Sequence, residues 1–510
     1  MAILGSIIKG ALQLRDRLDN DTRTPAEMQE AELRTLLERA QDTAFGQHYG
    51  FADLLTDPDP VSAYAARVPM HDYDKIHDEW WFRALNGGED ITWPGKVEFF
   101  AKSSGTSGSP SKYLPVTDDM RASIRSAGIK QVLGMANFDL PADFFEKEIL
   151  MLGSSIDLKE KENYAVGEIS GISASHLPSW FEGYYRPGRE IAAIREWNDR
   201  VQRIAEEAPN WDVGALSGIP TWIRLMLERI VEHNKLKTIH DIWPNLTIYA
   251  TGGVPFAPYR RSFEKMLARP LVYVDTYLAS EGFLAYQNRP NDQMAMRLNL
   301  DDGVYFEFIP FNVDTFTADG KPTEAAAAVP LREVEEGAEY ALLISTCSGN
   351  WRYLIGDTIR FTDLVRGEIV ITGRTKHFLD VGKAHFTVDR MTRAVEHVEK
   401  TFEAEIQEFT LAVDEGEGGD VHHWYLGSDE PLDHQPLLEA LEAGLREAVP
   451  HYDDARGQVA DVRVDVLGPE VFYRWLELNK KRGGQIKMPR LLRDEQLADW
   501  RTFISRKPVS

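Results

Sequence analysis

A stretch rich in glycine and small hydroxyl residues could bind a phosphate group. It reads FFAKSSGTSGSPSKYLPVT over residues 99–117, and its centre consists of Ser103, Ser104, Gly105, Thr106 and Ser107. Such residues let the backbone approach a phosphate closely and point N–H and O–H groups at its oxygens. The stretch is not a Walker A loop, because that motif ends in Gly-Lys-Ser or Gly-Lys-Thr, whereas Lys112 follows a serine here. Taken alone, the stretch is read more simply as an ordinary surface turn.

Apolar strands that end in short polar loops are the elements that would position such a phosphate-binding stretch. Residues 246–250 read as a strand that ends at Gly252 and Gly253, and residues 271–274 read as a strand that precedes Ser280 and Glu281. Strands that alternate with helices in this way predict an α/β domain with a mainly parallel sheet. Ligands of such domains bind beyond the carboxyl ends of the strands. The three polar segments are therefore expected at one rim of the sheet.

The later chain changes in character twice. From Ala295 onward, short β segments separated by turn residues predict a small β subdomain. After Arg374 a new series of helices and strands begins, which predicts an α+β unit. Because 510 residues are too many for a single core, we expect a large domain over residues 1–375 and a smaller one over residues 376–510.

Composition excludes several classes of protein. Lys and Arg number 57 against 81 Asp and Glu, a net charge of −24 that disfavours nucleic acid and anionic membranes as partners. The single cysteine, Cys347, cannot form an intrachain disulfide, which indicates a reducing compartment. No run approaches the roughly 18 apolar residues that a membrane span needs, and the first 20 residues read as a packing helix rather than a signal peptide. We expect a cytoplasmic protein.

Several motifs, in order along the chain, resemble one known family. They read SSGTSGSPSK, YLASEG, NWRYLIGD, GRTKHFLDVGK and RGGQIKMPR. Together they resemble the Gretchen Hagen 3 family, the auxin-responsive acyl-acid amido synthetases, over the range from about Val68 to Arg490. This family belongs to the adenylate-forming superfamily, together with acyl-CoA ligases and firefly luciferase. The resemblance implies a large multi-layer N-terminal domain and a smaller, mobile α+β C-terminal domain.

The resemblance also implies residue roles in binding ATP. Ser103, Ser104, Gly105, Thr106 and Ser107 match the phosphate-binding loop, Gly252 and Gly253 match a turn along the adenine, and Tyr277 matches an aromatic residue that stacks on that base. Ser280 and Glu281 match a pair that faces the α-phosphate and its Mg²⁺, Asp357 matches the carboxylate that binds the ribose hydroxyls, and Arg374 precedes the hinge. Lys383 matches a lysine just inside the mobile domain.

Three of these positions carry the catalytic roles: Thr106, Glu281 and a mobile-domain lysine. That lysine is assigned to Lys487, since Gln485 stands where many superfamily members have lysine and residues 485–490 fit the amido-synthetase pattern Q-x-K-x-P-R. Leu354 replaces an arginine of the family pattern, so a contact of that arginine with the second substrate is in doubt. Two structural alternatives remain open: Glu281 as a helix cap and Asp357 as a turn residue.

The activity implied is an ATP-dependent ligation of a carboxylic acid to an amine such as an amino acid, through an acyl-AMP. The residue types suit this chemistry, because donors and cations must neutralise the phosphates before a carboxylate can attack one. Two alternatives stay open, an acyl-CoA ligase that uses the same adenylate and a nucleotide-binding protein without catalysis. Residues 120–135 and 169–185 are expected to line the acyl pocket, and neither segment identifies the acid.

Overall fold

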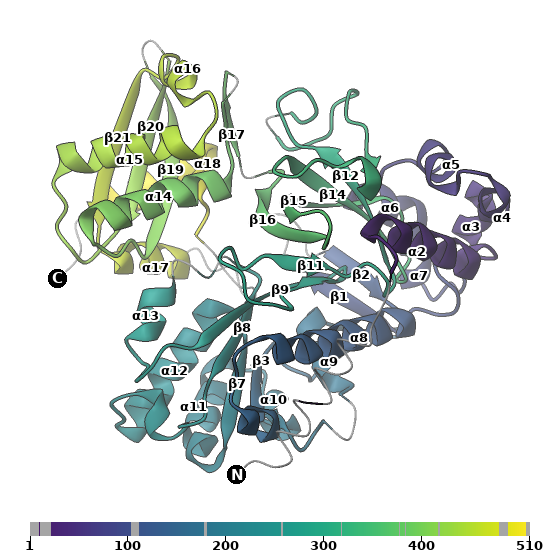
Figure 1. Cartoon of the computed structure of the whole chain (residues 1–510), viewed down its shortest axis with the longest axis horizontal. Coiled ribbons are helices and arrows are strands. Elements are labelled where there is room, and N and C mark those ends of the chain that lie inside the picture. The colour runs from purple at the N-terminus through teal and green to yellow at the C-terminus, as the bar shows by residue number, and fades with distance from the viewer. Residues whose placement is uncertain are drawn as a thin grey trace.

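The computed structural model describes residues 10, 22–103, 112–177, 181–254, 256, 259–317, 319–376, 378–382, 384–416, 419–478 and 488–505. Within these residues a large mixed sheet forms the centre of the molecule, and a four-stranded sheet near the C-terminus forms a separate layer (Figure 1). Helices cover both sheets, and the α/β class predicted from the sequence is confirmed.

The large sheet contains twelve strands in the described part of the chain. Their order across the sheet is β13 (Val329–Pro330), β12 (Val304–Pro310), β14 (Glu339–Thr346), β15 (Tyr353–Asp363), β16 (Glu368–Arg374), β11 (Met296–Leu298), β10 (Gly282–Tyr286), β9 (Val272–Ala279), β8 (Ile248–Gly252), β7 (Val213–Gly218), β3 (Glu148–Leu152) and β6 (Tyr185–Arg186).

The strands from β9 to β6 are parallel, as the alternation of strands and helices predicts. One face of these strands packs on helices α11 (Trp197–Glu207), α12 (Pro220–Asn234) and α13 (Arg260–Glu264), and together they enclose an apolar cluster. Along the opposite face runs α8 (Asp118–Gly134) with the short helix η2 (Met135–Asn137), and Met135 packs there against Ile248 and Val274. Burial on both faces explains the continuous apolar sequence of these strands.

The short β segments after residue 295 do not form a sheet of their own. Strand β10 turns back antiparallel to β9, and β11, β16, β15, β14, β12 and β13 continue the same sheet with antiparallel pairing. The sequence pattern marks each strand but not its neighbours, so the expected β subdomain is the antiparallel half of one sheet. The turn between β9 and β10 carries Ser280 and Glu281 at the edge between the two halves.

A smaller four-stranded sheet flanks the glycine-rich stretch. Its order is β2 (Lys112–Val116), β1 (Phe99–Ser103), β5 (Ala165–Gly167) and β4 (Lys159–Glu160). Strands β1 and β2 pair antiparallel, with Ser103 opposite Lys112. Helix α9 (Ile169–Ser175) follows β5. The pairing fixes both ends of the stretch next to the large sheet.

Helices at the N-terminal end cover the antiparallel half of the large sheet. The first of these, α2 (Pro25–Ala40), begins with a capping box in which Thr24 accepts from the backbone of Glu27 and Glu27 accepts in return. The next are α3 (Ala44–Tyr49), α4 (Phe51–Thr56) and α5 (Pro60–Arg67). Their apolar side chains join the largest core cluster, which includes Trp81 and Trp351.

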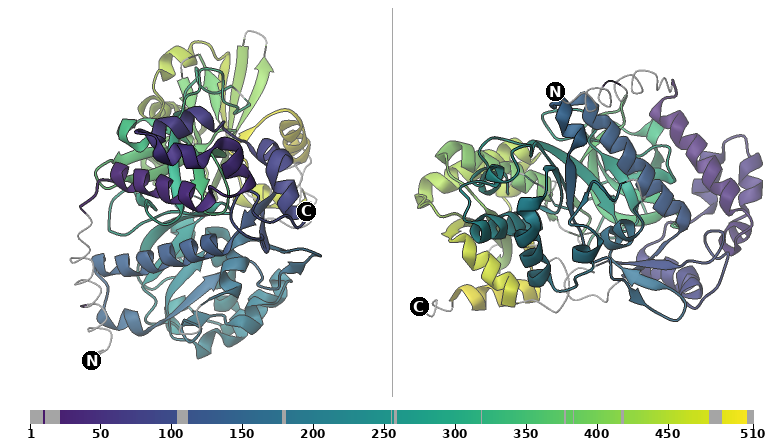
Figure 2. Two further views of the ribbon diagram at one scale, coloured as in Figure 1. Left: turned by 90° about the vertical axis from the view of Figure 1, so that its right-hand side faces the viewer. Right: turned by 90° about the horizontal axis from the view of Figure 1, so that it is seen from below.

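The C-terminal sheet lies between two pairs of helices. Its order is β21 (Asp461–Leu467), β20 (Gly419–Gly427), β19 (Glu408–Gly416) and β22 (Leu491–Leu492). Helices α14 (Val388–Phe402) and α15 (His434–Ala448) cover one face, and α17 (Pro469–Leu478) and α18 (Asp494–Ser505) cover the other. A hairpin of β17 (Leu379–Val381) and β18 (Ala384–Phe386) precedes α14. Figure 2, right, shows this yellow-green layer at the end of the molecule opposite the purple N-terminal helices.

None of the helices in the described ranges is both long enough and apolar enough to cross a lipid bilayer.

Candidate active site

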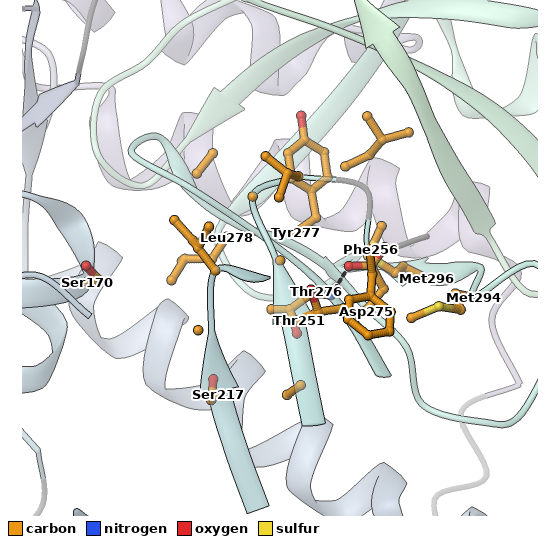
Figure 3. Close-up of a pocket in the computed structure, with 18 of the residues that line it drawn as sticks. Ser170, Ser217, Thr251, Phe256, Asp275, Thr276, Tyr277, Leu278, Met294 and Met296 are labelled. Carbon is orange, nitrogen blue, oxygen red and sulfur yellow. Dashed lines mark hydrogen bonds between the residues drawn. The ribbon is translucent and has the colours of Figure 1, made fainter. Parts of the chain in front are cut away.

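A cavity of about 2950 Å³ lies where the parallel strands of the large sheet end and the C-terminal helices approach them. It is much larger than the ~300–1,000 Å³ of a pocket for one small ligand. Eight of the residues predicted for the site line it: Ser103, Gly252, Gly253, Tyr277, Ser280, Glu281, Asp357 and Arg374. Figure 3 shows part of this lining, with Thr251, Asp275 and Tyr277 along neighbouring strands. The described candidates therefore meet in one place.

Asp357 is held from two sides. The Tyr277 hydroxyl donates to Asp357 Oδ2 at 2.5 Å, and Arg374 Nε donates to Asp357 Oδ1 at 2.6 Å. Arg374 lies opposite Asp357 in the pairing of β15 with β16, so the sheet register itself aligns the ion pair. Burial and the charge of Asp357 raise the pKa of Tyr277, which keeps its hydroxyl a donor. Asp357 lies within β15, and the alternative of a turn residue is therefore wrong.

Glycine is required where β8 ends. A Cβ atom on Gly252 would lie 2.6 Å from the carbonyl oxygen of Thr276 on β9, closer than such contacts allow. Gly253 has φ 77°, a left-handed conformation that favours glycine. The backbone therefore turns here without side chains and leaves the wall of the cavity flat.

Glu281 is a carboxylate without an ion-pair partner in the part of the chain that the structure describes. Burial in the cavity wall and the nearby charge of Asp357 raise its pKa to about 7, while Arg374 and Lys112 act in the opposite direction. Strand β10 begins at the next residue, so the alternative that Glu281 caps a helix is wrong. A cation at this carboxylate would relieve the clustering of negative charge.

The side chains at Glu281 suit Mg²⁺ that is shared with phosphate oxygens rather than a metal held only by protein ligands. No group of three or more His, Cys, Asp or Glu side chains that could hold a metal occurs in the described ranges. Mg²⁺ is commonly bound by one or two carboxylates together with phosphate oxygens and waters. Glu281, with Ser280 beside it, suits that mode.

Lys112 brings positive charge to the entrance of the glycine-rich stretch. Its ammonium group lies 5.1 Å from the centre of the Tyr73 ring. Burial lowers the pKa of Lys112, and the charge of Glu281 opposes that effect. Lys112 therefore lies close enough to Glu281 to balance part of its charge.

Six predicted residues lie outside the described residues: Ser104, Gly105, Thr106, Ser107, Lys383 and Lys487. Described residues next to two of these segments line the cavity. Ser103 lines the cavity at one end of the glycine-rich stretch, and Met488 lines it directly after Lys487.

Residues 120–135 were expected to line the acyl pocket and they line this cavity, but the hydrogen bond of Gln131 and the place of Asp275 were not predicted. Gln131 on α8 reaches the sheet, where its Nε2 donates to Thr276 Oγ1 at 2.8 Å. Asp275 lines the same cavity two residues before Tyr277, and burial raises its pKa to about 7. Gln131 carries no local signal, since its partner is 145 residues away. Asp275 could have been found from its spacing, because residues i and i+2 of a strand share a face.

Ion pairs join the C-terminal layer to the large sheet and its helices. Arg390 Nη2 on α14 lies 2.9 Å from Glu339 Oε2 on β14. Lys265 Nζ, just after α13, lies 3.0 Å from Oε2 of the buried Glu405. The Arg261 side chain lies 3.8 Å from the same Glu405 carboxylate. These contacts place α14 along one wall of the cavity.

Comparison with known proteins identifies three matching family models. The GH3 family N-terminal domain matches residues 14–181 and 126–270, the GH3 family central domain matches residues 298–371, and the GH3 family C-terminal domain matches residues 389–496. A curated relative, the probable indole-3-acetic acid-amido synthetase GH3.9 of Oryza sativa subsp. japonica, is 25% identical over 283 residues. That match covers 49% of this chain and 61% of the relative. The chain thus matches less than two thirds of that relative's length.

Solved structures show the same fold. The AtGH3.15 acyl acid amido synthetase in complex with 2,4-DB has a TM-score of 0.72 at 18% identity, over 97% of this chain and 96% of that one. A 2-hydroxyisobutyryl-CoA ligase in the postadenylation state, in complex with 2-HIB-AMP, has a TM-score of 0.55 at 12% identity, over 93% of this chain and 91% of that one. The adenylate-forming architecture expected from the sequence is confirmed.

Proposed function

The chain belongs to the GH3 family, and we propose that it is an ATP-dependent acyl-acid amido synthetase. The observation that carries the proposal is the meeting of Gly252, Tyr277, Glu281 and Asp357, from separate strands and turns, around one cavity. These are the positions that the family resemblance assigns to the nucleotide. The backbone itself requires Gly252, but the fold alone gives no reason for Tyr277, Glu281 and Asp357 to meet there.

The reaction has two steps. A carboxylate oxygen of the acid attacks the α-phosphorus of ATP, and the bond from that phosphorus to the β-phosphate oxygen breaks to release pyrophosphate. An amine, having lost its ammonium proton, then attacks the carbonyl carbon of the acyl-AMP, and the carbon–oxygen bond to AMP breaks. The products are an amide and AMP.

For the nucleotide, we assign the adenine to the ring of Tyr277 and to the flat wall at Gly252 and Gly253. The ribose hydroxyls donate to Asp357, whose orientation Tyr277 and Arg374 already fix. The phosphates lie toward Ser103, Ser104, Gly105, Thr106 and Ser107, with Lys383 and Lys487 approaching from the C-terminal domain. A bound Mg²⁺ would neutralise phosphate charge at Glu281 and Ser280.

Local positive charge is needed because the whole chain carries a net charge of −24. Arg374 and Lys112 supply it next to Glu281. Preorganised donors and cations at the position where charge develops commonly make the greatest single contribution to such catalysis. Lys487 is proposed to add to them during adenylation.

We further propose that residues 1–375 and 376–510 act as two domains that reorient between the half-reactions. The ion pairs of Arg390 with Glu339 and of Lys265 with Glu405 hold the present arrangement. The chain neighbours Asp389, Glu264 and Ala404 line the cavity, so exchange of these ion pairs can open a path for the amine. Gating of this kind is frequent in enzymes with two-step chemistry. The partners are small acids and amines, and a cytoplasmic location remains a prediction.

Pyrophosphate release tests the proposal. The protein is mixed with ATP, Mg²⁺ and a panel of carboxylic acids, with and without a mixture of amino acids, and products are identified by mass spectrometry. Acid-dependent pyrophosphate and an acyl-amino acid are expected. A thioester formed with coenzyme A instead would assign the acyl-CoA ligase alternative, and ATP binding without pyrophosphate would assign a non-catalytic protein.

Asp357→Asn is the matched variant for this test, since it keeps the shape and removes the charge that accepts from the ribose. We expect kcat/KM for ATP to fall at least about tenfold, which corresponds to ~1.4 kcal/mol. Lys487→Ala should lower adenylation with no change in thermal stability. Unchanged kinetics in both variants would contradict the assigned site.

A further inference from the structure

The cavity has an arm between α8 and the large sheet that the nucleotide does not need. Gly128 and Gln131 of α8, Ser217 of β7, Ala250 of β8 and Thr276 of β9 line it. Strands β7, β8 and β9 pair in register, so alternation places Ser217, Ala250 and Thr276 on the face that α8 covers. Tyr277, next along β9, points to the opposite face, toward Asp357.

The floor of this arm is apolar. Met135, Ala215, Ile248 and Val274 are buried together beneath it. Such a floor fits the hydrocarbon or aromatic body of an acid. A purely apolar acid would need nothing more.

The rim of the arm, in contrast, carries hydrogen-bonding groups with unused capacity. Gln131 Nε2 donates to Thr276 Oγ1 at 2.8 Å, which leaves the Gln131 carbonyl oxygen as a free acceptor and the Thr276 hydroxyl proton as a free donor. Ser217 has no hydrogen bond to any residue in the described ranges through its hydroxyl group. Figure 3 shows Ser217 and Thr276 on separate strands in this part of the cavity. Ser217 is level with Ala250 and Val274, two strands from β9 and two residues short of Thr276, so one ligand group does not reach both hydroxyls. Gln131 and Thr276 together offer one acceptor and one donor.

A hydroxyl group is the substituent that matches this set, because it donates one hydrogen bond and accepts others. The distance of this hydroxyl group from the reacting carboxyl follows from the position of Thr276 along β9. Thr276 lies three residues before the end of β9 at Ala279, about 10 Å along a strand at ~3.3 Å per residue, and Ser280 follows in the turn. The hydroxyl must therefore stand at the far end of the acyl group rather than beside the carboxyl.

We propose that the acid substrate carries a hydroxyl group at the end of its acyl chain or ring distant from the carboxyl, and that Gln131 and Thr276 recognise that group. This inference rests on the proposed function, since it deepens the acid site of the same reaction. A pocket built to hydrogen-bond a substrate hydroxyl rejects the analogue without it, because its polar groups are then left unpaired.

Matched acid pairs test the proposal. The pairs are 4-hydroxycinnamic and cinnamic acid, 3-(4-hydroxyphenyl)propanoic and 3-phenylpropanoic acid, and 8-hydroxyoctanoic and octanoic acid. Acid-dependent pyrophosphate release gives kcat/KM for each acid, and calorimetric titration gives its Kd. In at least one pair we expect the hydroxylated member to be favoured about tenfold or more, which corresponds to ~1.4 kcal/mol.

Gln131→Leu and Thr276→Val should reduce that preference to within a few-fold. Gln202→Met, a glutamine substitution on α11 away from the cavity, is the control and should keep the wild-type ratio. Thermal unfolding shows whether Gln131→Leu still folds, and Thr276→Val provides a second variant of nearly unchanged shape.

The outcomes separate the two proposals. Binding preference for hydroxylated acids without pyrophosphate release would contradict the proposed function and support this inference. Equal or better binding and turnover of the plain acids in every pair, or a hydroxyl preference that survives both variants, would overturn the inference while the ligase assignment stands. The absence of any binding in all pairs would also overturn it.

Discussion

At the scale of single residues, Tyr277 performs two separable tasks, one through its ring and one through its hydroxyl. The ring is assigned to the adenine, and the hydroxyl donates to Asp357 Oδ2 at 2.5 Å. Tyr277→Phe removes only the second task. We expect KM for ATP to rise about three- to tenfold, since one hydrogen bond to a charged group contributes ~1.5 kcal/mol or somewhat less here, because Arg374 still holds the carboxylate. Initial rates of pyrophosphate release measure this change.

The ribose hydroxyls provide the discriminating readout. If the Tyr277 hydroxyl orients Asp357, the penalty for 2′-deoxy-ATP relative to ATP should be smaller in Tyr277→Phe than in the wild type. Tyr277→Ala is the control that removes the ring as well and should weaken both nucleotides. An unchanged penalty in Tyr277→Phe would mean that the hydroxyl has no part in ribose recognition.

At the scale of elements, a buried ion pair within the large sheet, between Arg352 just before β15 and Glu307 of β12, also binds the end of helix α5. Arg352 and Glu307 have side chains only 7% and 3% exposed, and Arg352 Nε donates to Glu307 Oε2 at 3.0 Å. The same guanidinium donates to the carbonyl oxygens of Ala65 and Val68 at 2.7 and 2.6 Å. Arg352→Met should lower the free energy of unfolding by about 3–5 kcal/mol, because it leaves Glu307 buried without its partner. Urea denaturation measures the loss.

Arg332→Met is the matched control. Its partners Asp59 and Glu333 lie 3.6 and 3.4 Å away, and all three side chains are exposed. An exposed ion pair contributes at most about 1 kcal/mol, so this variant should unfold close to the wild-type midpoint. A similar loss in both variants would show that burial does not decide the cost.

The elements also show what the sequence could predict. Polar residues after apolar strands indicate the rim of a sheet, and Gly252, Tyr277 and Asp357 were expected at one cleft and do line one cavity. The order of strands could not be predicted, because alternation within a strand says nothing about its neighbours. The antiparallel strands after residue 295 were therefore expected as a subdomain, although they extend the central sheet.

Contacts across long sequence separations escaped prediction for the same reason. The bond from Gln131 to Thr276 depends on how α8 crosses the sheet. The pair of Arg390 with Glu339 depends on how the C-terminal layer docks. Neither residue differs locally from any solvent-facing glutamine or arginine on a helix, so only the assembled fold gives it a role.

At the scale of the whole molecule, burial shifts the pKa values of several carboxyl groups upward. Burial raises the pKa values of Glu32, Asp275 and Glu399 to about 7, and burial with the charge of Asp357 does the same for Glu281. In the unfolded chain these groups titrate near 4. Between the two values the folded state binds more protons than the unfolded state, so stability falls as pH rises.

Buried histidines oppose this trend at lower pH. Burial lowers the pKa values of His71 and His422 to about 4, so each adds stability as pH rises toward 6.5, the ordinary histidine value. Below pH 6.5 the four raised carboxyl groups outweigh the two histidines, so stability still falls as pH rises, and above pH 6.5 only the carboxyl groups titrate. The nucleotide-free protein should therefore lose several degrees of Tm between about pH 5 and pH 8, most of it before pH 7.5.

Glu32 allows that prediction to be checked on one group. Its Oε1 accepts from the backbone N–H of Gly303 at 3.0 Å, a bond that the amide oxygen of glutamine can also accept. Glu32→Gln removes the titration without removing the contact, so its Tm should fall less steeply than that of the wild type between pH 6.5 and 8. Differential scanning calorimetry at fixed ionic strength measures both curves. Parallel curves, or a wild-type Tm that rises over this range, would show that buried carboxyl groups do not set the pH dependence of stability.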